Sequence, residues 1–115
     1  MKVIDLSRGM VFVTGGGGSI GAAICVEAAS AGASVAVADV NISAAQKTVE
    51  KIEKLGGRAI ALEIDVTSSE SLQQAMAKAE AKLGQMIGLV TAAAILRTGS
   101  VETQSEAGWR EIMSV

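Results

Sequence analysis

The sequence predicts an α/β protein built on a doubly wound parallel sheet, and three observations indicate this fold. Half of the 115 residues are hydrophobic while only 2% are aromatic, so aliphatic side chains dominate. Such side chains are typical of strands that are buried on both faces of a parallel sheet. Short apolar runs also alternate with segments of helical spacing, and glycines separate them. With right-handed crossovers this order gives a parallel sheet covered by helices, in a single domain that we expect over residues 1–115.

The first predicted unit is a strand, a loop and a helix. Met10–Thr14 is an apolar run that ends at glycines, which predicts a buried strand. Ser19–Ala31 has helical spacing, and Gly32 is the stop expected just after a helix. Between them lie four consecutive glycines, 15–18. Glycine costs a strand or helix more backbone entropy than any other residue, so this block must lie where side chains would obstruct something.

Two more strands are predicted at Ser34–Ala38 and Arg58–Ile64. The segment Ser43–Leu55 between them is predicted as a helix, which the next two glycines bring to an end. Its inward face has the i, i+4, i+7 spacing of an amphipathic helix, with Ala45, Val49 and Ile52.

The remaining segments continue the alternation. Thr67 and Glu70 have the spacing of a capping box, which predicts the start of a helix that runs to Leu83. The apolar stripe of this helix consists of Leu72, Ala75, Met76, Ala79 and Leu83. A fourth strand follows at Ile87–Ala93. Thr103 and Glu106 repeat the capping-box spacing before a last helical face with Trp109, Ile112 and Met113. The sequence therefore predicts four strands with interleaved helices, the first half of a doubly wound fold.

Composition excludes several classes of function. The net charge is −2 and the chain has no run of basic residues, so the electrostatic footprint of a nucleic-acid-binding protein is missing. With no His and one Cys, Cys25, an internal disulfide is excluded and a zinc site lacks its usual ligands; Cys25 is expected to be a small buried hydrophobic residue. The apolar run Met86–Leu96 is much shorter than the ~20 residues that span a bilayer. Asp5 and Arg8 lie where a signal peptide needs its apolar region. We expect a soluble, cytoplasmic protein that binds neither membranes nor nucleic acid.

The glycine block predicts a dinucleotide site. Gly16, Gly18 and Gly21 form G-x-G-x-x-G between a strand and a helix, where backbone N–H groups and the positive helix end can hold a pyrophosphate. Asp39 follows Gly21 by 18 residues, at the end of the second predicted strand. A carboxylate there can accept both hydroxyl hydrogens of an adenosine ribose and repels the 2′-phosphate of NADP. This Rossmann-like pattern predicts NAD as the cofactor.

Two further points bear on Asp39 and on the choice of cofactor. No Arg or Lys lies between Gly15 and Gly32 or directly after Asp39, so a partner for a 2′-phosphate is missing there. The alternative is that Asp39 simply forms a turn after the strand, since Asn41 and Ser43 are turn-prone as well. Both interpretations of Asp39 stay open at this point.

The segments "TGGGGSIG", "ADVN", "IDV" and "GLVTAAAI", in this order, resemble the short-chain dehydrogenase/reductase family, from Met10 to Val115. The family pattern T-G-x-x-x-G-x-G aligns with Thr14, Gly15 and Gly21 but places Ser19 on its middle glycine. A left-handed backbone at Ser19 would cost ~1 kcal/mol or more, so we expect either a shifted loop or a less demanding position. The Ser19 hydroxyl could instead bond a phosphate.

The resemblance also implies roles for residues outside the glycine motif. Asp65 and Val66 would flank the adenine, with the Asp65 carboxylate accepting from its amino group, and the Ile20 backbone would touch the pyrophosphate. Without the family, Asp65 would merely end a strand. The segment 91–94, "TAAA", stands where the family usually has N-N-A-G, and backbone contacts from Ala92 and Ala93 could survive this change. The implied cofactor site consists of Gly15, Gly18, Ser19, Ile20, Gly21, Asp39, Asp65, Val66, Ala92 and Ala93.

The resemblance implies no catalytic residue within the chain. The family transfers protons with a Tyr, whose pKa a neighbouring Lys lowers, together with a Ser and an Asn. All four lie further along the family's chains than the residues matched here, and this sequence has no Tyr at all. The first hypothesis is therefore that these residues are the NAD-binding N-terminal part of an oxidoreductase of roughly twice the length, cut before the catalytic segment. By resemblance, that protein would transfer a hydride between NAD(H) and an alcohol or carbonyl substrate, as a homo-oligomer.

Two alternatives belong to other classes. The chain could be a complete NAD-binding or assembly module without catalysis. It could also be part of a methyltransferase that binds S-adenosylmethionine through a similar glycine loop and Asp39. That class usually has an acidic residue just before its glycines, where this chain has Val13 and Thr14. The methyltransferase is therefore the least favoured of the three.

Overall fold

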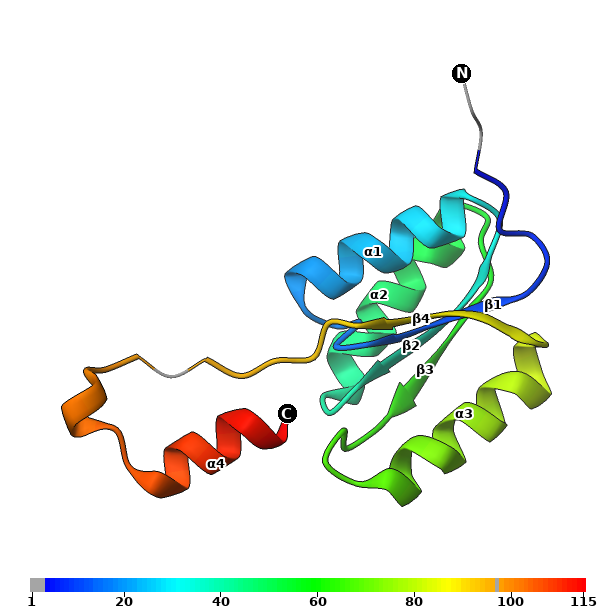
Figure 1. Ribbon diagram of the computed structural model, residues 1–115. Helices are drawn as coiled ribbons and strands as arrows, with labels where there is room; N and C mark the ends of the chain where they lie inside the picture. The colour runs from blue at the N-terminus through cyan, green and yellow to red at the C-terminus, as the bar shows by residue number, and fades with distance from the viewer. Residues whose placement is uncertain (1–3, 97) are drawn as a thin grey trace.

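The computed structural model describes residues 4–96 and 98–115, and these residues form an α/β sandwich (Figure 1). In chain order its elements are β1 (Met10–Thr14), α1 (Ser19–Ser30), β2 (Ser34–Asp39), α2 (Ile42–Lys54), β3 (Ala59–Glu63), α3 (Ser69–Leu83), β4 (Met86–Thr91), the 3-10 turn η1 (Val101–Thr103) and α4 (Glu106–Ser114). Within the described residues the sheet has four parallel strands in the order β3-β2-β1-β4. This confirms the predicted first half of a doubly wound sheet.

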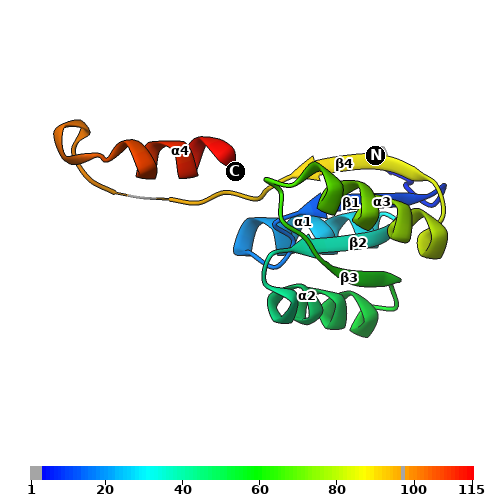
Figure 2. The same ribbon diagram turned by 90° about the horizontal axis from the view of Figure 1, so that it is seen from below.

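The sheet is covered by helices on both faces. α1 and α2 lie on one face and α3 lies on the other (Figures 1 and 2). Alternate residues of the two central strands point to opposite faces, as in any β-strand. Val11 and Val13 pack with α1 and α2, whereas Met10 and Phe12 pack with α3. Every residue of β1 is buried, which explains its continuous apolar sequence.

The carboxyl ends of the strands are aligned at one edge of the sheet. Thr14, the last residue of β1, is paired with Ala38 in β2 and with Thr91 in β4. Asp39, the last residue of β2, is paired with Glu63 in β3. The loops that follow the four strands therefore meet at the same edge, which is where open α/β sheets bind their ligands.

Both predicted capping boxes are wrong by one or two residues. The residue before α3 is Ser68, whose hydroxyl accepts from the Ser71 amide at 3.2 Å, while Thr67 donates its hydroxyl to Asp65. The residue before α4 is Ser105, and Thr103 belongs to η1 instead. In both places several hydroxyl side chains follow one another, and local hydrogen bonds decide which of them caps the helix.

The chain after β4 leaves the sheet. An extended segment leads to α4, most of which lies apart from the sandwich, while its C-terminal end returns toward the carboxyl edge of the sheet (Figures 1 and 2). The apolar residues Trp109 and Met113 in α4 are 60% and 67% exposed. β4 also ends earlier than predicted, at Thr91, so that Ala92 and Ala93 belong to the extended segment.

The thiol of Cys25 is predicted to be unreactive in the folded chain. Cys25 lies in the core between α1, α2 and the sheet, and burial raises the pKa of its thiol to about 12. Because the thiolate is the reactive form, a disulfide reagent is expected to modify Cys25 only after unfolding. Absorbance of the released thiol measures this with and without denaturant. Rapid modification of the native chain would contradict the buried position.

Candidate functional site

The loop after β1 runs so close to the end of β4 that its first residue has no room for a side chain. Gly15 has a φ of +71°, in the left-handed region that favours glycine. A Cβ atom on Gly15 would lie 2.6 Å from the amide nitrogen of Ala93 and 2.8 Å from the carbonyl oxygen of Ala92. The glycine therefore allows the backbone of the loop to touch the backbone that follows β4.

The other glycines of this region also mark close approaches. A Cβ on Gly16 would lie 2.7 Å from Cγ1 of Val37, and one on Gly17 would lie 2.7 Å from Cβ of Ala44 in α2. A Cβ on Gly21 would collide with the carbonyl group of Gly15. Only Gly18 has ordinary space, with its nearest neighbour at 3.5 Å. The glycine block thus packs the loop at once against β2, against α2 and against the segment that follows β4.

Three amide groups of the loop are already used inside the protein. Gly16 donates to the carbonyl of Ala38 at 3.0 Å, Gly17 to Asp39 Oδ2 at 2.9 Å, and Gly18 to the carbonyl of Gly15 at 3.1 Å. The first turn of α1, 19–21, has no side-chain cap and no acidic residue. Its N–H groups and the positive end of the helix dipole therefore offer the anion site of this loop.

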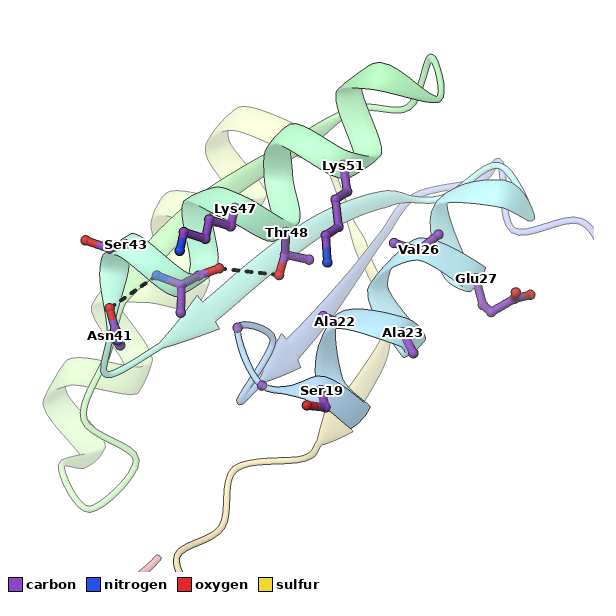
Figure 3. A pocket seen from close by; sticks show the side chains of 13 residues that line it. Ser19, Ala22, Ala23, Val26, Glu27, Asn41, Ser43, Lys47, Thr48 and Lys51 are labelled. Carbon is purple, nitrogen blue, oxygen red and sulfur yellow. Dashed lines mark hydrogen bonds between the residues drawn. The ribbon is translucent and has the colours of Figure 1, made fainter.

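Ser19 does not have the strained backbone that a left-handed position would impose. It is the first residue of α1, and no described residue other than glycine has a positive φ. The serine at the family's middle-glycine position is thus accommodated as an ordinary helical residue. Its exposed side chain lies beside the groove between α1 and α2 (Figure 3).

Asp39 both forms a turn and faces the loop. Its Oδ1 accepts from the Asn41 amide at 3.0 Å, which is the turn-forming contact, and its Oδ2 accepts from Gly17. Each carboxylate oxygen has a second lone pair, so both can still accept a hydroxyl hydrogen. The two interpretations that the sequence left open are therefore compatible.

A cavity of about 430 Å³ lies at the carboxyl edge of the sheet. This volume is in the range of small-molecule sites. The cavity brings together seven of the predicted cofactor residues: Gly15, Gly18, Asp39, Asp65, Val66, Ala92 and Ala93. Its lining also includes Ala94, which stands where the family usually has a glycine, and four residues that the sequence did not single out: Val40, Ile64, Ile95 and Val115. Ser19, Ile20 and Gly21 do not line the cavity but follow its glycine wall into α1.

The carboxylate of Asp65 is oriented by its neighbours. Oδ1 accepts from the Thr67 hydroxyl at 2.6 Å and from the Thr67 amide at 2.9 Å. These bonds, the hydroxyl first, lower the pKa of Asp65 below its ordinary value, so the group stays charged as the pH falls. Asp65 thus presents a fixed negative charge at the cavity, which suits an amino group of a ligand.

A second cavity, of about 750 Å³, lies in the groove between α1 and α2 (Figure 3). It begins at Gly17 and Gly18 of the loop, and Lys47 and Lys51 reach it from α2. Both lysines were missed as possible partners of a phosphate because neither lies beside the glycines or Asp39 in the sequence. Their helical spacing from Ala44, which packs against the loop, is the signal that could have found them.

Other kinds of site have no support among the residues that the structure covers. No group of three His, Cys, Asp or Glu side chains there could hold a metal ion. None of the helices seen in these residues is long and apolar enough to cross a membrane.

Comparisons with known proteins agree with this geometry. A model of the family described as short chain dehydrogenase matches residues 9–115. The 2,5-dichloro-2,5-cyclohexadiene-1,4-diol dehydrogenase LinX of Sphingobium indicum is 33% identical over 110 residues, which cover 96% of this chain and 44% of the relative.

Solved structures show the same fold. The crystal structure of a dehydrogenase/reductase from Sinorhizobium meliloti 1021 has a TM-score of 0.93 and 38% identity, over 98% of this chain and 45% of that chain. That of a hydroxysteroid dehydrogenase from Escherichia coli has a TM-score of 0.89 and 34% identity, over 97% of this chain and 47% of the other. The 115 residues thus span about half the length of the proteins they match.

Proposed function

The chain belongs to the short-chain dehydrogenase/reductase family and corresponds to the N-terminal portion of its members, and we propose that it binds the dinucleotide NAD(H) at the carboxyl edge of its sheet. The observation that carries the proposal is that Gly15, Asp39 and Asp65, which lie at or just after the ends of three strands, line the wall of one cavity. Next to that wall, the uncapped first turn of α1 supplies the amides that a pyrophosphate needs.

Each part of the dinucleotide has a proposed partner in this geometry. The amides of Ser19, Ile20 and Gly21 would bind the pyrophosphate, with the Ser19 hydroxyl as a further donor. The Asp39 carboxylate would accept the hydroxyl hydrogens of the adenosine ribose. Asp65, with the Val66 backbone, would bind the adenine edge, and the backbone of Ala92 and Ala93 would line the cavity beside the cofactor.

We propose NAD rather than NADP because Asp39 holds its carboxylate at the ribose. A 2′-phosphate there would bring a second negative charge close to a carboxylate that is fixed by Gly17 and Asn41. Lys47 and Lys51 line the adjacent groove and would be a source of compensating positive charge. The preference for NAD thus requires that Asp39 repels the 2′-phosphate more strongly than these two lysines attract it.

Hydride transfer between NAD(H) and an alcohol or carbonyl group is the proposed activity of the protein to which these residues belong. Both the diol dehydrogenase and the hydroxysteroid dehydrogenase are named for substrates that carry hydroxyl groups. The cofactor would supply or accept the hydride. In family members Tyr, Lys, Ser and Asn side chains carry out the proton transfer. Here that step would depend on residues other than these 115, since the sequence has no Tyr.

Equilibrium titration tests the proposal. The purified chain is titrated separately with NADH, NADPH and S-adenosylmethionine, and binding is followed by ligand fluorescence or calorimetry. We expect saturable binding of NADH, binding of NADPH weaker by about tenfold or more, which corresponds to about 1.4 kcal/mol, and no binding of S-adenosylmethionine. Equal affinity for NADPH would contradict the role of Asp39, and binding of S-adenosylmethionine without binding of NADH would contradict the proposed cofactor.

A further inference from the structure

The peptide group that joins Gly16 to Gly17 is held on both of its sides. Its carbonyl oxygen, on Gly16, accepts a hydrogen bond of 2.8 Å from the hydroxyl of Thr48. Its N–H, on Gly17, donates to Asp39 Oδ2 at 2.9 Å. Because the C=O and N–H of a planar trans peptide point in opposite directions, the two bonds together fix the rotation of this peptide.

Thr48 is well placed for this contact. It lies within α2, the residue is 2% exposed, and it faces the loop side of the groove between α1 and α2 (Figure 3). Its contact with the carbonyl of Ala44, at 3.4 Å, is the weaker bond to the preceding turn that helical threonines often make. The shorter bond to Gly16 connects α2 with the glycine loop. Since Gly16 is buried as well, water has poor access to replace the hydroxyl.

The peptide needs such a restraint because glycines lie on both of its sides. Glycine permits backbone rotations that other residues resist, so this peptide can turn over more easily than its neighbours. A reversed peptide would point the carbonyl oxygen of Gly16 at the carboxylate of Asp39. Two oxygens that both accept hydrogen bonds repel each other, and Asp39 would leave the position in which it faces the cavity.

We infer that Thr48 is a positioning residue of the dinucleotide site: its hydroxyl locks the Gly16–Gly17 peptide, and the locked peptide holds the Asp39 carboxylate where it meets the ribose. This inference rests on the function proposed above. It assigns to α2 a role in affinity, although Thr48 lies outside the cavity of the carboxyl edge.

The first test separates the effect of the Thr48 hydroxyl on NADH binding from the effect of its side-chain packing. Thr48→Val keeps the shape of the side chain and removes the hydroxyl, whereas Thr48→Ser keeps the hydroxyl. We expect the valine variant to bind NADH about tenfold more weakly and the serine variant within about threefold of the wild type. Ile52→Val is the matched control, because Ile52 is buried in the same helix and its substitution disturbs the core without removing a hydrogen bond to the loop. Circular dichroism verifies that each variant is folded.

A double-mutant cycle then asks whether Thr48 acts through Asp39. In an Asp39→Asn chain, Thr48→Val is expected to change the affinity for NADH by less than about threefold, because the carboxylate that it positions is gone. The inference is overturned if Thr48→Val binds like the wild type, if Ile52→Val is weakened equally, or if the two effects of the cycle simply multiply.

A measurement without ligand tests whether the Thr48 hydroxyl restrains the Gly16–Gly17 peptide. Hydrogen exchange of the Gly17 amide, followed by NMR, is expected to be faster in Thr48→Val and unchanged in Ile52→Val and Thr48→Ser. If the wild-type chain fails to bind NADH, the proposed function fails, and this exchange rate still decides whether Thr48 locks the peptide. Unchanged exchange at Gly17 in Thr48→Val would overturn the inference.

Discussion

Replacing Gly21 with alanine is expected to destabilise the fold by a net amount of about 1 kcal/mol and to weaken dinucleotide binding by more than about tenfold. A Cβ at this position meets only backbone, namely the carbonyl group of Gly15 and Cα of Gly16. Since no flexible side chain can give way, the loop must move from the first turn of α1. Overpacking of this kind costs about 1–3 kcal/mol, which exceeds the ~1 kcal/mol that alanine gains over glycine in a helix. Urea unfolding and titration with NADH measure the two effects.

The matched control is Gly88→Ala in β4. A Cβ there has ordinary contacts, at 3.6 Å and more from Val11, and Gly88 does not have a positive φ. We expect no loss of stability and unchanged NADH binding in this variant. If Gly21→Ala were as stable as Gly88→Ala and bound NADH equally well, the close packing of α1 on the loop would be refuted.

Asp39→Asn is expected to weaken NADH binding by about 10- to 100-fold. Hydrogen bonds to a charged group contribute about 1.5–3 kcal/mol, and the neutral amide would lose this charge at the ribose. The amide also has one acceptor oxygen where the carboxylate has two, so one of its two present partners, the amides of Gly17 and Asn41, would face another donor. The preference over NADPH is expected to narrow at the same time, because the repulsion of the 2′-phosphate is gone.

Glu63→Gln provides the control for charge. Glu63 is exposed, lies beside Asp39 in the register of β3, and does not line the cavity. The substitution removes the same charge from the neighbouring strand. We expect NADH binding to stay within about twofold of the wild type, as is usual for an exposed charge away from the ligand. Equal losses in both variants would mean that Asp39 acts only through the overall field of the protein.

The sequence was sufficient to predict the sheet and its helices because the apolar pattern and the glycines agree with each other. Met10–Thr14 is buried throughout, and Gly32 has a φ of +100° just after α1, as a helix stop requires. The helix starts were less predictable. Around Ser68 and around Ser105 several residues could cap the helix, and only the folded backbone selects one of them.

The site could be predicted in part for a topological reason. In a parallel sheet the loops after neighbouring strands meet, so Gly15, Asp39 and Ala92 share one cavity even though they are far apart in the chain. Ser19 posed a question of backbone strain that the sequence could not answer, and its helical conformation removes that question.

The contacts made by α2 were not predictable from the sequence. Thr48 bonds a carbonyl that lies 32 residues earlier in the chain, and this depends on how closely α2 lies over the loop. The close approach is possible because Gly17 leaves no side chain opposite Ala44. A threonine in a helix has the same local pattern whether it packs in a core or holds a loop.

The most direct test of the dinucleotide site is an NMR titration of the isotope-labelled chain with NADH. A dinucleotide site at the carboxyl edge of the sheet predicts saturable shifts of amide signals that cluster at Ser19–Gly21, Asp39, Asp65–Val66 and Ala92–Ala93, with saturation at much higher concentration in Asp39→Asn. Saturable shifts confined to another surface, such as the groove of Lys47 and Lys51 or the exposed face of α4, would contradict it. The absence of any saturable shift would contradict it as well.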